Sequence, residues 1–300
     1  MDHGTTLVYG GTGAQGSAIA RALCAKGWSV RVLTRSPEKA ANIKREGAEA
    51  VCADLSDAQA VSAASQGCEN VVFTLPLVFD ADLALEWTAN VVIAAQSAGV
   101  KRFIFNASGP VPEEETGVVA LDIKRRASRL LAESGLPVIT LQPTLYMGNL
   151  AAPWSAPTIV RDGVVAYPLP GELKVSWISW ETLAEFAAAA LERPGLAGRS
   201  FRVAGPEALT GAEVARTFSE HLCRPVTYFP VPLDDFRRNL APVLGETAAD
   251  AITHLYAWFA GEGARTLTPD IAPALEALNV VPQRISEWVG TVNWTALAAA

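Results

Sequence analysis

The sequence predicts an α/β fold in which a doubly wound parallel sheet is followed by a smaller, mainly helical C-terminal lobe. Three observations carry this prediction. In the first 143 residues, short apolar runs alternate with stretches whose apolar residues recur at helical spacing. The runs are continuously apolar, which is typical of parallel strands covered on both faces. The first run also leads through a glycine-rich turn into a helix.

Six strands are expected before residue 143, with a helix after each of the first five. The strands cover residues 7–9, 30–34, 50–53, 70–73, 102–105 and 137–141. Pro37 opens the second helix and Asp57 is placed to cap the third. The two longest helices cover about 82–98 and 118–133, and each ends at a glycine.

The pattern changes after Pro143. Residues 147–177 are rich in Pro, Trp and Gly and contain no long helix, and the strand–helix alternation resumes over 175–191 and 201–203. Thr210 begins a helix that runs to 221, with Glu213 at the capping-box position. A short strand and three helices follow, over 226–229, 234–240, 248–260 and 269–278. We therefore expect a first domain over 1–150, rejoined by 175–205, and a smaller lobe over 151–174 and 206–300.

Composition narrows the class of protein. The chain has 300 residues, of which 50% are hydrophobic, so it is a folded globular protein. Its net charge of −7 argues against broad binding to nucleic acid or to an anionic membrane surface. Four cysteines without paired spacing and three scattered histidines predict reduced thiols, a cytoplasmic protein and no metal. We expect neither a signal peptide nor a membrane span.

The glycine-rich turn predicts a dinucleotide site. Its glycines fit both Gly-x-Gly-x-x-Gly and Gly-x-x-Gly-x-x-Gly, directly between a strand and a helix. Glycines let the backbone approach a pyrophosphate, and the helix N-terminus offers free N–H groups and the positive end of its dipole. The alternative is a purely structural turn. The expected contacts come from Gly10, Thr12, Gly13, Ala14, Gln15 and Gly16.

Arg35 indicates which nucleotide binds. It follows the second strand, where an acidic residue would hold the ribose 2′-hydroxyl of NAD. Arginine beside Ser36 suits a 2′-phosphate instead, and Lys39 adds charge one turn later, so we favour NADP(H). The alternative is an exposed basic helix start. Asp54, after the third strand, either accepts a hydrogen bond from the adenine amino group or serves only as a turn residue.

These residues resemble the NmrA-like group of atypical short-chain dehydrogenases/reductases over nearly the whole chain. The matching segments are Gly10–Gly16, Val30–Arg35, Cys52–Ser56, Asn106–Ser108, Ser134–Pro137, Gln142–Leu150 and Val203–Thr210, together with Lys124. The resemblance implies a Rossmann fold whose first domain binds NADP(H) and whose smaller lobe binds substrate. Further cofactor contacts are then expected from Leu55, Thr74, Leu75, Pro76, Asn106, Lys124 and Pro143.

The resemblance also locates a candidate catalytic group, with one departure. Ser108 and Lys124 stand where short-chain dehydrogenases carry a serine and a lysine. Ala120 stands four residues before the lysine, where the tyrosine belongs, and it cannot give a proton. From the residues alone, Lys124 is also read as part of a solvated face and Ser108 as a turn residue. Tyr146 is a candidate substitute that lines the pocket, or a packing tyrosine.

Three functions stay open at this stage. The first is an NADPH-dependent oxidoreductase that transfers hydride to a hydrophobic or aromatic acceptor, namely a quinone, enone, carbonyl or imine. The second is a non-catalytic NADP(H) sensor that binds a protein partner, and the third is lyase or isomerase chemistry on a retained fold. A homodimer is also considered. An apolar pocket is expected from Leu75–Leu77, Thr144, Met147, Trp154, Trp177 and Trp258.

Overall fold

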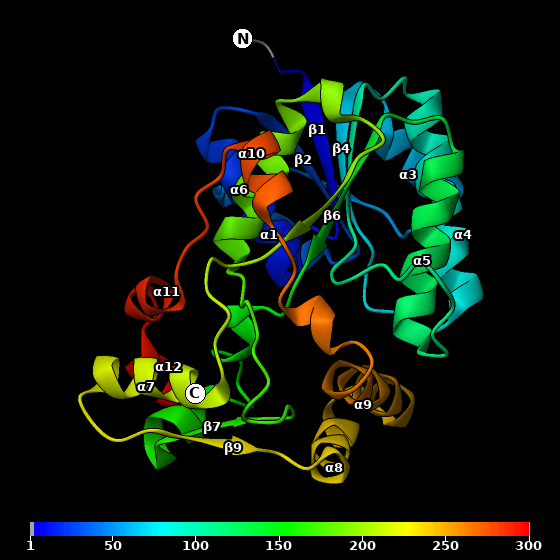
Figure 1. Ribbon diagram of the computed structural model, residues 1–300. Coiled ribbons are helices and arrows are strands. Elements are labelled where there is room, and N and C mark those ends of the chain that lie inside the picture. The colour runs from blue at the N-terminus through cyan, green and yellow to red at the C-terminus, as the bar shows by residue number, and fades with distance from the viewer. Residues whose placement is uncertain (1–2, 300) are drawn as a thin grey trace. The chain divides into compact units, whose positions relative to one another are not determined.

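The computed structural model describes residues 3–299 and contains a seven-stranded sheet with strand order β3-β2-β1-β4-β5-β6-β8 (Figure 1). Pairing is parallel at every junction from β3 to β6. The strands are β1 (Thr5–Tyr9), β2 (Ser29–Thr34), β3 (Glu49–Cys52), β4 (Cys68–Thr74), β5 (Arg102–Asn106), β6 (Val138–Pro143) and β8 (Ser200–Val203). The predicted parallel α/β sheet is therefore confirmed.

Helices cover this sheet. They are α1 (Ala14–Ala25), α2 (Pro37–Arg45), α3 (Ala58–Ser65), α4 (Ala81–Ser97), α5 (Val119–Glu133), α6 (Trp180–Leu191) and α10 (Ala272–Leu278). Helices α3, α4 and α5 follow one another along one side of the sheet (Figure 1). The ion pair between Lys26 and Glu185 (2.9 Å) joins the end of α1 to α6. Asp57 caps α3 by accepting hydrogen bonds from two backbone N–H groups, as predicted.

The strand order places a switch point between β1 and β4. The chain runs outward from β1 through β2 to β3, and then returns to the other side of β1 as β4. Loops that follow β1 and β4 therefore diverge, and sheets of this kind bind ligands in the crevice expected at the carboxyl ends of such strands. The buried strand residues Tyr9, Phe73 and Phe105 form the core beneath this edge.

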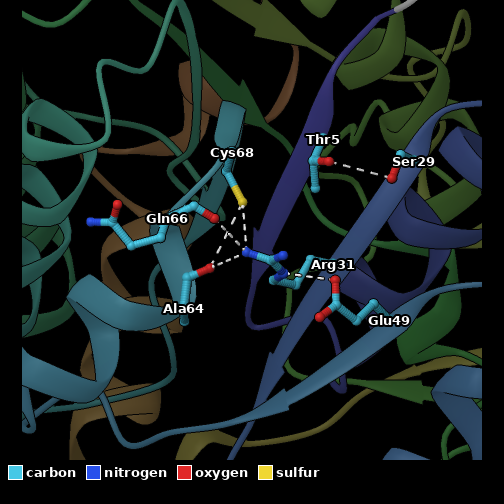
Figure 2. A network of polar contacts seen from close by, with 7 residues as sticks. All are labelled: Thr5, Ser29, Arg31, Glu49, Ala64, Gln66 and Cys68. Carbon is cyan, nitrogen blue, oxygen red and sulfur yellow. Dashed lines mark hydrogen bonds and ion pairs between the residues drawn. The ribbon is translucent and has the colours of Figure 1, made fainter.

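Arg31 on β2 links several elements away from this crevice (Figure 2). Its Nε donates to Glu49 Oε2 on β3 at 2.8 Å. One Nη donates to the carbonyl oxygens of Ala64 and Gln66 and, at 3.3 Å, to Cys68 Sγ. Burial raises the pKa of the Cys68 thiol. All four cysteines are free, which agrees with the expected reduced state.

The chain divides into two compact units. The first contains the described residues up to Pro143, then Leu183–Arg202 and Ile271–Val280. It thus ends at Pro143 rather than 150, and the returning segment is 183–202 rather than 175–205. Helix α10, expected in the smaller lobe, belongs to the first unit. Sequence order alone does not tell which core a short helix such as α10 covers, because its buried face contacts distant segments.

The second unit contains Thr144–Thr182, Val203–Asp270 and the described residues from Val281 onward. It includes α7 (Gly211–Leu222), α8 (Leu233–Leu244), α9 (Glu246–Ala260), α11 (Ile285–Thr291), α12 (Trp294–Ala299) and the two-stranded parallel sheet of β7 (Val164–Tyr167) and β9 (Thr227–Pro230). The capping box of Thr210 and Glu213 is confirmed at the start of α7. The core of the second unit includes Tyr167, Trp177, Phe218 and Trp288.

Four elements of this unit differ from the sequence expectation. Strand β7 and helices α11 and α12 were not predicted, because they have only four to seven residues each, too few for a periodic pattern to stand out. Residues 175–179 were expected to begin a strand. They form only isolated bridges, between Val175 and Leu209 and between Tyr146 and Ile178, before α6 starts. Within residues 3–299, no helix has both the length and the apolar character that a membrane span requires.

Candidate functional site

Three glycines of the predicted turn are required by the fold itself. Gly10 has φ +70°, and its carbonyl oxygen accepts a hydrogen bond from the Gly13 N–H at 3.0 Å. A Cβ on Gly16 would lie 2.3 Å from that same carbonyl oxygen, so only glycine lets α1 start this close to the turn. A Cβ on Gly11 would lie 2.6 Å from Val32 on β2. These positions bring the helix N-terminus to the carboxyl edge of the sheet.

Gly13 is different, because nothing in the protein requires it to be glycine. It has φ −84°, which suits any residue, and a Cβ there would meet only Gly10 O at 3.4 Å. Gly13 is exposed, and as the N-cap residue of α1 it supplies no side-chain cap. The turn therefore presents bare backbone beside the helix N-terminus, which is the arrangement that a pyrophosphate needs. The residues present fit a dinucleotide at this turn, with Thr12, Ala14 and Gln15 around it.

Arg35 lies exposed at the end of β2, as predicted. Its Nη1 is 3.8 Å from Asp54 Oδ2, and both side chains are open to solvent. The other carboxylate oxygen of Asp54 accepts from the Ser56 N–H at 2.9 Å, so the turn role is confirmed and the adenine contact stays a prediction. Ser36 caps α2 by accepting from the backbone N–H of Lys39. Arg35 is thus an exposed guanidinium whose ion-pair partner Asp54 is also open to solvent, and a phosphate can reach it.

A polar network joins the glycine turn to the ends of β4 and β5. Asn106 Nδ2 donates to Gln15 Oε1 at 2.7 Å and to Thr74 Oγ1 at 3.2 Å. Ser108 Oγ also donates to Gln15 Oε1 at 2.7 Å. The Ser108 N–H donates to Asn106 Oδ1 at 3.1 Å, and Ser108 has the left-handed φ of +55°. Four predicted residues, Gln15, Thr74, Asn106 and Ser108, are therefore brought together.

Lys124 on α5 completes the network. Its Nζ donates to the Ser108 carbonyl oxygen at 2.9 Å, and burial lowers the pKa of the lysine to about 8. A Cβ on Gly109 would lie 2.6 Å from this Nζ, so glycine at 109 makes room for the ammonium. The solvated-face interpretation of Lys124 is therefore wrong. Ala120, one helical turn earlier, is buried.

The remaining predicted residues lie around or outside this network. Leu75 and Pro76 are half-buried in the loop after β4, and Pro143 is buried at the end of β6. Leu55 packs in the core and its carbonyl oxygen accepts from Asn90, and its contact with a cofactor stays a prediction. Tyr146 belongs to the second unit, so its placement near Ser108 stays a prediction.

The expected pocket tryptophans divide by exposure. Trp177 is buried in the core of the second unit against the edge of Tyr167, and Trp154 is 63% exposed. Trp258 is partly buried and lies over Gly263. Sequence reasoning missed the role of Gly109, because the side chain that fills its space comes from a different element. Among residues 3–299, no cluster of three or more His, Cys, Asp or Glu side chains could hold a metal ion.

The fold and the glycine turn define a Rossmann-type dinucleotide-binding protein. The chain belongs to the NmrA-like family, whose match covers residues 2–289. It is 33% identical over 253 residues to the NAD(P)H azoreductase of Xenophilus azovorans, covering 84% of this chain and 86% of that protein. It is 29% identical over 217 residues to quinone oxidoreductase 2 of Escherichia coli, covering 70% and 71%.

Solved structures show the same fold. The triphenylmethane reductase of Citrobacter sp., complexed with NADP(H), superposes with a TM-score of 0.79 at 20% identity, covering 95% of this chain and 99% of that one. The NADPH-dependent quinone oxidoreductase QOR2 of Escherichia coli, complexed with NADPH, gives a TM-score of 0.74 at 23% identity, covering 95% and 98%. At these identities the likeness concerns the fold.

Proposed function

We propose that this chain is an NADPH-dependent oxidoreductase that reduces a hydrophobic or aromatic acceptor, namely a quinone, enone, carbonyl or imine. The observation that carries the proposal is the network from the glycine turn to Lys124. In this network the Lys124 ammonium, whose pKa is lowered, is linked through Ser108 and Gln15 to the glycine turn. The azoreductase and the quinone oxidoreductase among the relatives support the same class of reaction.

The cofactor would be held at three places. The bare backbone at Gly13 and the N-terminus of α1 would receive the pyrophosphate. Arg35 would bind the 2′-phosphate through charge-assisted hydrogen bonds, with Ser36 and Lys39 beside it. Lys124 would reach the nicotinamide ribose. When bound, NADPH supplies a hydride from C4 of its nicotinamide ring.

Lys124 also provides the proton that reduction of the acceptor requires. Among the described residues, its Nζ has one hydrogen-bond partner, the Ser108 carbonyl oxygen, although an ammonium has three N–H donors. A pKa of about 8 keeps the group protonated at pH 7 yet ready to release its proton. With this role, Lys124 would supply the proton that Ala120, which stands at the position of the tyrosine, cannot give. The hydride and this proton together complete a two-electron reduction.

NADPH consumption tests the proposal. The wild-type protein and Arg35→Ala are assayed with NADPH and with NADH against a panel of quinones, azo dyes and aromatic ketones. Arg45→Ala, which removes an exposed arginine from the last turn of α2, is the matched control. We expect Arg35→Ala to raise KM for NADPH by about tenfold to a hundredfold, since hydrogen bonds to charged groups contribute about 1.5–3 kcal/mol. KM for NADH should change little.

Three results would contradict parts of this proposal. Equal effects of Arg35→Ala on both nucleotides would remove the 2′-phosphate contact. Tight binding of NADPH without oxidation by any acceptor would favour a sensor, and a reaction that proceeds without nucleotide would favour lyase or isomerase chemistry.

A further inference from the structure

Gln15 lies in the glycine turn at the start of α1, but its side chain forms hydrogen bonds with residues at the end of β5 and in the loop after it. Its Oε1 accepts two hydrogen bonds, from Asn106 Nδ2 and Ser108 Oγ, each at 2.7 Å. These partners follow Gln15 by 91 and 93 positions in the sequence. One oxygen atom therefore joins the helix that starts at the cofactor turn to the loop that carries Ser108.

Ser108 needs such support because its backbone is strained. A non-glycine residue at φ +55° costs about 1–3 kcal/mol and persists only where its surroundings hold it. Asn106 Oδ1 accepts from its N–H, Lys124 Nζ donates to its carbonyl oxygen, and Gln15 Oε1 accepts from its hydroxyl. The Ser108 carbonyl oxygen orients the Lys124 ammonium. Gln15 therefore holds the same residue whose carbonyl oxygen binds Lys124.

The bond to Gln15 also decides which way the Ser108 proton points. The amide oxygen of Gln15 can only accept, so Ser108 Oγ must donate to it. Ser108 then presents lone pairs rather than its proton to a bound molecule. Ser108 therefore cannot donate to an acceptor while it donates to Gln15, and Lys124 is the donor of the pair.

We infer that Gln15 is a positioning residue that fixes Ser108, and through its carbonyl Lys124, relative to the cofactor turn. This inference rests on the proposed reductase function, because its kinetic readout is NADPH oxidation. It differs from the sequence expectation, in which Gln15 was a cofactor ligand. A cofactor ligand changes nucleotide affinity when it is removed, whereas a positioning residue changes the rate of the bound complex.

Three variants separate these roles. Gln15→Leu removes the accepting oxygen at similar size, and Gln15→Glu keeps an oxygen that can accept both hydrogen bonds. Ser17→Ala is the matched control, since it removes a hydrogen bond within the same turn of α1, from Ser17 Oγ to the Ala14 carbonyl oxygen. For each variant, Kd for NADPH is measured by fluorescence titration and kcat with the best quinone acceptor.

We expect Gln15→Leu to lower kcat by tenfold or more and to change Kd by less than threefold. Gln15→Glu should restore kcat to within threefold of wild type, and Ser17→Ala should leave both constants unchanged. Introducing Gln15→Leu into Ser108→Ala should lower kcat by less than a further threefold, because the residue through which Gln15 acts is already altered. A larger effect on Kd than on kcat, or effects that multiply in the double variant, would overturn the inference.

Thermal unfolding of the wild type, Gln15→Leu, Ser108→Ala and the double variant keeps this test separate from the function. If none of the tested acceptors supports NADPH oxidation by the wild-type protein, the proposed function fails. The coupling between Gln15 and Ser108 is still measurable in that case. The inference then requires that the double variant lose no more in Tm than the more damaging single variant. Additive losses in Tm would overturn it irrespective of activity.

Discussion

Replacing Lys124 by methionine should make the protein more stable at neutral pH while it abolishes reduction. Burial lowers the pKa of Lys124 from 10.5 to about 8, which corresponds to about 3 kcal/mol against the charged form in the folded state. Methionine of similar length removes that cost but leaves the Ser108 carbonyl oxygen without its donor, which costs about 1 kcal/mol. The expected net gain at pH 7 is therefore about 2 kcal/mol in the free energy of unfolding.

The sign of the pH dependence follows from the lowered pKa. Below pH 8 the lysine is protonated in both states, so the wild type bears the full cost of burying the charge. Between about pH 8 and 10.5 the unfolded state binds more protons than the folded state, so the wild type gains stability as the pH rises. By pH 9.5 about 2 kcal/mol of the cost should have disappeared, and the two proteins should then be nearly equal in stability.

Urea denaturation of both proteins at pH 7 and 9.5 measures this difference. Arg126→Met, on the same helix but half-exposed and paired with Glu115, is the control and should show no such change between the two pH values. A Lys124→Met protein that is less stable at pH 7, or whose advantage is unchanged at pH 9.5, would refute the reasoning. The kinetic counterpart is a loss of kcat of about a hundredfold or more, whereas wild-type kcat/KM should fall above about pH 8.

Two further outcomes distinguish the residues of the site from those of the fold. Gly13→Ala should leave Tm within a degree or two of wild type, because its Cβ has room in the protein, but it should weaken NADPH binding, because that Cβ would meet the cofactor. Gly16→Ala should cost about 1–3 kcal/mol in stability, because its Cβ would collide with the Gly10 carbonyl oxygen. Both are read by unfolding and by fluorescence titration; equal losses of stability would contradict the distinction. Tyr146→Phe should lower kcat severalfold if its hydroxyl bonds the acceptor, and unchanged turnover would dismiss that role.

The local elements of the first unit could be predicted because their signals lie close together in the sequence. The turn from Gly10 to Gly16, the cap at Asp57 and the exposed Arg35 each depend on residues within one strand–turn–helix segment. The capping box at Thr210 is equally local. Such features follow from backbone conformation and short-range hydrogen bonds, and the structure has them where they were expected.

The contacts between distant segments were decided only by the tertiary structure. Gln15 meets Asn106 and Ser108 because the strand order sets β1, β4 and β5 side by side, and nothing near residue 15 encodes that neighbourhood. The lowered pKa of Lys124 likewise depends on the groups that shield it from water. Helix α10 belongs to the first unit, and its short sequence does not show which core its buried face covers. The sequence by itself thus determined the cofactor turn and its charge preference, through local backbone geometry. The packing of strands far apart in the chain determined how the reacting groups are held.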